Sequence, residues 1–165
     1  MLSLKRSVRI IEASLATATE LQAIGFAVVR SWLAETSALV GPTGHILMRS
    51  ARARELELVL GETPEPGFCW ILTKVRHTSY SDADEFDAAD YSSFSLTNWL
   101  AHNPVADNGR LLTQRLDATD EARFASDVVR FLRDWQELLM RTPGLSSVVR
   151  GETWQRIPFD WGGMR

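Results

Sequence analysis

The sequence predicts an α+β domain in which a mainly antiparallel sheet of four or five strands packs on an N-terminal helix and a long C-terminal helix. Two patterns carry this prediction. Near both ends, apolar residues recur every three or four positions, as on one face of a helix, whereas between residues 26 and 75 they tend to alternate as in strands. A chain of 165 residues has room for one core. We therefore expect a single domain over residues 1–144 and an aromatic C-terminal tail over residues 145–165.

The longest helix is expected over residues of about 120–141. Asp117 or Thr119 can cap its first turn, and Pro143 with Gly144 ends it. At ~1.5 Å per residue it is ~33 Å long, so its apolar face should cover most of one side of the sheet. That face consists of Phe124, Val128, Phe131, Leu132, Trp135, Leu138 and Leu139.

The remaining elements follow in chain order. Residues 4–23 have the spacing of an amphipathic helix that ends before Gly25, and Ser95 can cap a short helix. Consecutive strands joined by short loops pair antiparallel, and the alternation of Glu55 and Glu57 with leucines indicates a sheet with one polar face. The strands are expected at residues 26–33, 45–49, 55–60, 68–75 and 110–116.

Composition narrows the class of protein. A formal charge of -3 is too small by itself to attract nucleic acid or an anionic membrane. The single Cys69 can form no internal disulfide and no multi-cysteine zinc site, which indicates a reducing, cytoplasmic compartment. No apolar run approaches the ~20 residues of a membrane span. We expect neither a cofactor nor a bound metal.

The sharpest local feature is an acidic segment in which the strand pattern stops. It lacks the glycine and the closing glutamate of a calcium-binding loop. Such a segment is either solvated loop surface or a contact surface for a basic partner, and flanking tyrosines favour contact. The candidate contact residues are Tyr80, Asp82, Asp84, Glu85, Asp87, Asp90 and Tyr91.

The C-terminal tail is a second candidate contact surface. Trp154, Ile157, Phe159 and Trp161 are too apolar to remain in water. They are expected either to fold back over the sheet or to dock on another protein, in which case Trp154, Phe159 and Trp161 bind that partner.

Catalytic spacings are missing from the sequence. His45, His77 and His102 have no partner at a recognised spacing, and Cys69 lies inside an expected strand, where a thiol is usually inert. His77 stands next to the acidic segment, so one alternative is a small metal-assisted hydrolase that uses His77 and the carboxylates of that segment.

A further alternative is a nucleic-acid-binding accessory protein. Arg49, Arg52 and Arg54 cluster around an expected turn and could form a basic face with Lys5 and nearby N-terminal arginines. Scattered arginines on a slightly acidic protein disfavour this alternative.

The order of helix, strand meander and long helix is similar in outline to small bacterial proteins that work by binding, such as immunity proteins of toxin systems and accessory subunits. Charge and aromatic residues gather where regular structure is not expected, and loops are where binding residues concentrate. The leading hypothesis is a non-enzymatic, immunity-like inhibitor or accessory subunit that binds another protein through the acidic segment and the tail.

Overall fold

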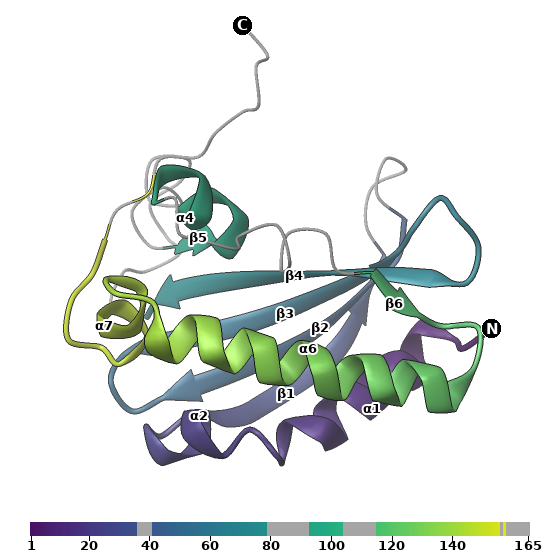
Figure 1. Ribbon diagram of the computed structural model, residues 1–165, viewed down its shortest axis with the longest axis horizontal. Coiled ribbons are helices and arrows are strands. Elements are labelled where there is room, and N and C mark those ends of the chain that lie inside the picture. The colour runs from purple at the N-terminus through teal and green to yellow at the C-terminus, as the bar shows by residue number, and fades with distance from the viewer. Residues whose placement is uncertain (36–40, 79–92, 104–114, 156, 158–165) are drawn as a thin grey trace, which may run out of the picture.

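The computed structural model describes residues 1–35, 41–78, 93–103, 115–155 and 157. They form one antiparallel sheet with helices packed on it (Figure 1). In chain order the elements are α1 (Leu4–Leu15), α2 (Thr19–Ala23), β1 (Ala27–Ala34), β2 (Thr43–Ser50), β3 (Arg54–Glu62), β4 (Phe68–His77), β5 (Ser93–Ser95), α4 (Leu96–His102), β6 (Arg115–Asp117), α6 (Glu121–Arg141) and α7 (Leu145–Val149).

The sheet runs in the order β1-β2-β3-β4-β5, and β6 pairs with β4 as well. Every pairing is antiparallel, which confirms the predicted fold class. The described residues form six strands, because residues 93–95 add an unexpected strand beside β4. Of the strand expected at residues 110–116, the structure shows its end as β6, and residues 110–114 lie outside the described part.

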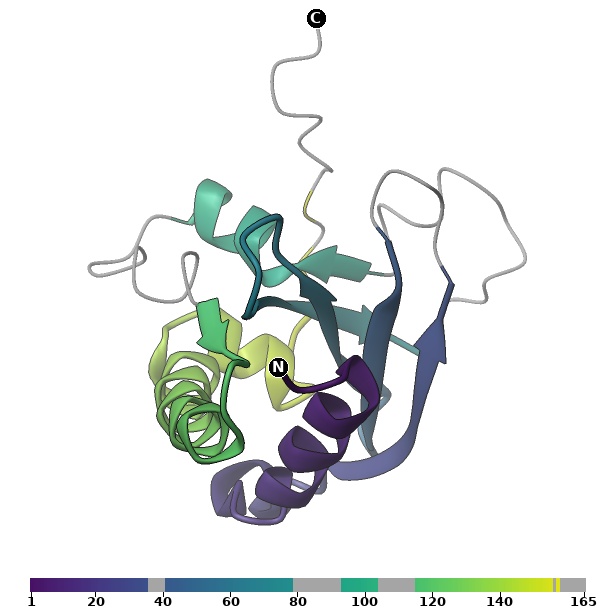
Figure 2. The same cartoon turned by 90° about the vertical axis from the view of Figure 1, so that its right-hand side faces the viewer.

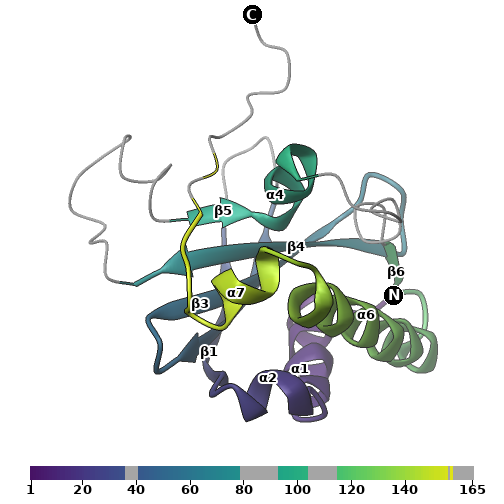
Figure 3. The same cartoon turned by 60° about the vertical axis from the view of Figure 1, so that its left-hand side comes forward.

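The helices α1, α2, α6 and α7 lie on one side of the sheet (Figures 2 and 3). The long helix α6 is confirmed, with Phe124, Phe131 and Trp135 buried in the core. Its cap is Asp120, whose carboxylate accepts hydrogen bonds from two backbone amides of the first turn, so the expected capping by Asp117 or Thr119 is wrong. Ser95 caps α4 as predicted.

The N-terminal helix is shorter than predicted. It ends at Leu15, and α2 follows after a break. At the break, the hydroxyl of Ser14 donates to the carbonyl of Ile10, and the hydroxyl of Thr17 donates to that of Ser14. Such side-chain bonds offer the backbone an alternative to the helix. The change of direction keeps Leu21 in the core.

The segment after Gly144 begins with the short helix α7, although no helical period is evident there in the sequence. Leu145, Val148 and Val149 are buried in the same core as α6. Ile157 is buried too, so the described part of the expected tail packs on the rest of the chain.

Candidate functional site

The face of the sheet opposite α1 and α6 carries charged and aromatic side chains. Leu56, Leu58 and Leu60 point into the helix-covered core, so Glu55, Glu57 and Val59 between them point the other way. We call this second surface the helix-free face, because α1, α2, α6 and α7 lie on the other side of the sheet; α4 flanks it beside β5. Cross-strand partners share a face, and its two central rows are therefore Arg30, Leu47, Glu57 and Lys74, and Trp32, His45, Val59 and Leu72.

A β-bulge in β1 sets which residues reach this face. The pairing with β2 shifts between Val28 and Arg30, which places Arg30 and Trp32 on the same side as His45. A bulge inserts one residue and re-aims the side chains that follow it. The bulge thus brings the aromatic part of β1 to the helix-free face.

Arg30, Trp32, Thr43, His45 and Glu57 form a connected group, which we call the Trp32 cluster. The rings of Trp32 and His45 stack with centroids 4.7 Å apart. The guanidinium carbon of Arg30 lies over the Trp32 ring, 4.4 Å from its centroid. Nδ1 of His45 is 2.7 Å from Oε1 of Glu57, and Nε2 is 2.9 Å from Oγ1 of Thr43. The histidine is therefore held at both nitrogens and over one ring face.

The order of carboxylate, imidazole and hydroxyl in this cluster is also that of a nucleophile-activating relay. The hydroxyl of such a relay must reach a substrate. Thr43 is only 2% exposed, so its position does not fit attack on a bound molecule. The hydrogen bonds instead fix His45 flat against Trp32, and the result is a rigid aromatic surface.

Beside the Trp32 cluster lies a hollow of about 430 Å³ between β3, β4, β5 and α4. Glu57 belongs to both, because it binds His45 and also lines the hollow. The hollow combines an apolar floor with charged, hydroxyl and amide groups. Its lining residues are Leu47, Glu55, Glu57, Leu72, Lys74, Arg76, Ser93, Phe94, Ser95, Thr97, Asn98 and Ile157.

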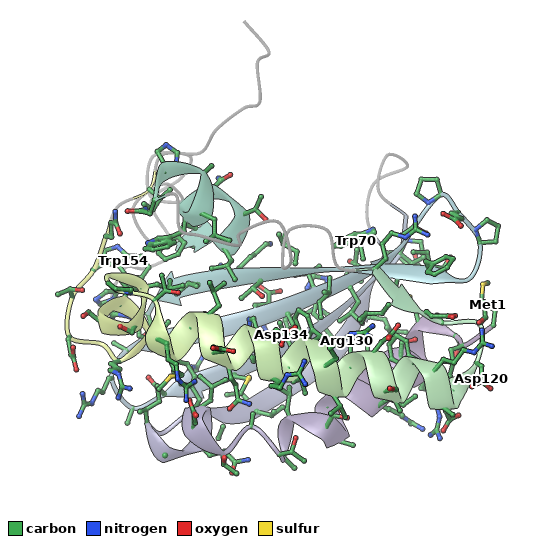
Figure 4. The ribbon with its side chains drawn as sticks, viewed as in Figure 1. Met1, Trp70, Asp120, Arg130, Asp134 and Trp154 are labelled. Carbon is green, nitrogen blue, oxygen red and sulfur yellow. The ribbon has the colours of Figure 1, made fainter. Side chains whose placement is uncertain are left out.

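Of the ten predicted contact residues, the structure describes Trp154. Its ring is half-buried and meets His77 edge-on at 5.3 Å and Phe94 at 5.4 Å. Figure 4 shows Trp154 beside α4 and α7, at the far end of β4 from Trp70. Trp154 therefore folds back on its own chain. The other nine lie outside the described residues: Tyr80, Asp82, Asp84, Glu85, Asp87, Asp90, Tyr91, Phe159 and Trp161.

Of the arginines expected to form a basic surface around the β2–β3 turn, Arg49 and Arg52 are exposed and Arg54 is buried. Arg54 is 3% exposed and donates to the carbonyls of Val148 at 2.8 Å and Thr153 at 2.7 Å. Arg49 binds Glu55, and the guanidinium of Arg52 donates to a backbone carbonyl after α7. The prediction that Arg54 contributes to a nucleic-acid-binding face is wrong, because its charge is used to hold the C-terminal segment.

Burial is the main cause of a pKa shift at two side chains, His77 and Cys69. Burial, followed by the positive charge of Arg54, lowers the pKa of His77. Burial, followed by the charge of Glu62, raises the pKa of the Cys69 thiol, which keeps it protonated and unreactive. The metal-assisted hydrolase remains a prediction, since the carboxylates that it requires lie outside the described residues.

Comparisons with known proteins gave no match to a family model, a curated protein or a solved structure. Within the described ranges, no three or more His, Cys, Asp or Glu side chains gather as a metal-binding group. No helix in the described part of the chain is both long and apolar enough to cross a membrane.

Sequence reasoning missed the Trp32 cluster. Thr43 and His45 are two positions apart, but Glu57 reaches them from the next strand, through the pairing of His45 with Val59 and of Leu47 with Glu57. The hairpin of β2 and β3 could have revealed the cluster from the sequence. If the turn is placed at residues 51–53, the antiparallel register brings His45 close to Glu57.

Proposed function

We propose that the protein is a non-enzymatic interaction module that binds an extended segment of another protein along β1. The observation that carries this proposal is the position of β1 at the edge of the sheet. It pairs with β2 on one side, and no other described strand pairs with it. An edge strand offers unpaired backbone groups to which an extended peptide can add as a further strand.

The side chains of β1 suit such a partner on both faces. On the helix-free face, Trp32 and Arg30 are residue types that dominate binding energy at protein interfaces. Val29 and Leu33 are about half exposed and are among the few large apolar side chains that the described residues leave in solvent. The partner segment that fits best alternates an acidic residue, to meet Arg30, with apolar residues.

The bulge in β1 limits the length of this contact. Regular pairing with β2 resumes at Arg30 and continues to Ala34. A bulge twists an edge away from a neighbouring strand, which protects it from indiscriminate pairing. Residues 30–34 are therefore the part of β1 that a partner strand of ordinary length would cover.

The proposal retains the expected biological setting. An immunity-like inhibitor or an accessory subunit in a reducing, cytoplasmic compartment fits a chain with one buried thiol. The acidic segment, which joins β4 to β5, and the aromatic end of the tail are proposed as secondary contacts. Reversing Asp82, Asp84 and Asp87 to lysine tests that role, since it should slow association and change its salt dependence; unchanged kinetics would remove the segment from the proposal.

The main test places a crosslinker on β1. A photoreactive amino acid at position 33 should capture one specific protein in the source cells, whereas the same group at Val129, an equally apolar site that is 61% exposed on α6, should not. The crosslinked protein is then purified and titrated with wild type, Leu33→Lys and Val129→Lys. Binding should be lost in Leu33→Lys and retained in Val129→Lys. Equal binding by both variants would refute β1 as the contact.

A further inference from the structure

The hollow on the helix-free face is lined by acidic side chains of β3 and basic side chains of β4. The strand register sets Glu57 opposite Lys74 and Glu55 opposite Arg76. Neither carboxylate forms an ion pair with its cross-strand neighbour: Glu57 turns to His45, and Glu55 turns to Arg49. Neighbouring strands are ~4.8 Å apart, so acidic and basic side chains line the hollow in adjacent rows.

Both carboxylates have one oxygen to spare. Oε1 of Glu57 takes the bond to His45, and Oε1 of Glu55 takes both bonds from Arg49. No described group donates to either Oε2 atom. Both side chains line the hollow, although they are only 8% and 18% exposed for Glu55 and Glu57 respectively. A carboxylate oxygen held in such a partly buried position is a good acceptor for a cationic donor.

The basic side of the hollow is similarly open. Lys74 lines it, and the ammonium of this side chain contacts no carboxylate in the part of the chain that the structure describes. Ser95, Thr97 and Asn98 line the same side and add hydroxyl and amide donors. A carboxylate of a ligand would find both a positive charge and neutral donors there.

The rest of the hollow is apolar. Leu47, Leu72, Phe94 and Ile157 form its floor, and its volume of about 430 Å³ is typical of small-molecule sites, which span ~300–1,000 Å³. We propose that this hollow binds a free α-amino acid with an apolar side chain. The ammonium contacts Glu57 and Glu55, the carboxylate contacts Lys74 and the nearby donors, and the side chain lies on the apolar floor.

This proposal goes beyond the protein-binding role and does not depend on it. The hollow lies between β3, β4, β5 and α4, whereas the partner contact lies on β1 at the edge of the sheet. The variant Leu33→Lys should therefore lose the partner and still bind the amino acid, so the two proposals can fail separately.

The test is calorimetric titration of the full chain with L-phenylalanine and L-leucine. Two probes each lack one charge: phenethylamine lacks the carboxylate, and 3-phenylpropanoate lacks the ammonium. Each probe loses the charge-assisted hydrogen bonds of one group, and the free energy of such bonds corresponds to at least ~10-fold in affinity. Phenylalanine or leucine should therefore bind at least ~10-fold more tightly than either probe. The proposal is wrong if neither amino acid binds at ~10 mM, the weak end of measurable affinity, or if the single-charge probes bind equally well.

Two variants locate the site. Lys74→Gln should weaken amino-acid binding at least ~10-fold and leave phenethylamine binding within about twofold, because only the carboxylate contact is removed. Lys5→Gln, at the chain's other lysine on the exposed side of α1, is the matched control and should change neither. If Lys5→Gln reproduces the effect, or if Lys74→Gln weakens both ligands equally while its circular dichroism is unchanged, the ligand does not lie at Lys74.

Discussion

Replacing Arg54 by methionine should destabilise the protein far more than the same change at its neighbour Arg52. The guanidinium of Arg54 donates to the carbonyls of Val148 at 2.8 Å, Thr153 at 2.7 Å and Ala53 at 3.0 Å. It also lies 5.0 Å from the ring of Trp154. Arg54 thus joins the β2–β3 turn to the C-terminal segment.

The magnitude follows from what the substitution leaves behind. Methionine keeps much of the apolar stem of Arg54, so the loss is mainly that of the charged donors. Each hydrogen bond to a charged group is worth ~1.5–3 kcal/mol, and removing one partner of a buried charged network costs ~3–5 kcal/mol. We expect a loss of about 3–5 kcal/mol for Arg54→Met, a large part of the ~5–15 kcal/mol stability of an ordinary domain.

Urea unfolding followed by circular dichroism measures this loss. In Arg52→Met, the one exposed bond to the carbonyl of Arg150 is removed, and the expected change is below ~1 kcal/mol. Amide hydrogen exchange should also show that residues 145–155 open more readily in Arg54→Met than in Arg52→Met. Equal unfolding free energies for the two variants would contradict the role of Arg54 as the group that anchors the C-terminal segment.

Three further predictions concern single positions. Ala53 has a φ of 56° in the β2–β3 turn, where an L-residue costs ~1–2 kcal/mol and glycine loses ~0.5–1 kcal/mol of entropy; Ala53→Gly should therefore raise the melting temperature slightly, and a fall would contradict strain there. A Cβ at Gly44 would lie 2.3 Å from Cγ2 of Val8, so Gly44→Ala should force α1 away from β2 and cost ~1–3 kcal/mol in urea unfolding. Burial, then the charge of Arg54, lowers the pKa of His77 in the folded protein. As pH falls from the ordinary pKa of about 6.5 toward the folded-state value, the unfolded chain takes up the proton first, so the protein loses stability. His77→Gln should therefore flatten the pH dependence of the unfolding free energy between about pH 7 and pH 5.

The elements with strong periodic signals were predicted well from the sequence. In α6, large apolar residues repeat from Phe124 to Leu139, and burial of Phe124, Phe131 and Trp135 confirms the face they define. The strands β2, β3 and β4 lie where strands were expected, and their antiparallel hairpins follow chain order. These features are local, so a single stretch of sequence contains all of the information.

The features that were missed depend on contacts between distant residues. Helix α7 has five residues and no period of its own; it forms where Arg54 donates to the carbonyl of Val148 and the core covers Leu145 and Val149. The cap of α6 is a local case by contrast: Asp117 accepts a hydrogen bond from Thr119, two residues away, and Asp120 takes the cap. In α7, the local preference is decided by partners that are distant in the sequence.

The candidate sites lie on the helix-free face because the helices cover the other face of the sheet. On the other face, α1 and α6 cover the leucines of β3. Covering the carboxylates of Glu55 and Glu57 with apolar residues would cost desolvation free energy. Arg49 and His45 of β2 bind them instead. Those partners bind one oxygen, Oε1, of each carboxylate. The binding roles that we propose for this face draw on its part-buried carboxylates and on the edge position of β1, and the burial of Thr43 does not suit its hydroxyl to attack on a bound molecule.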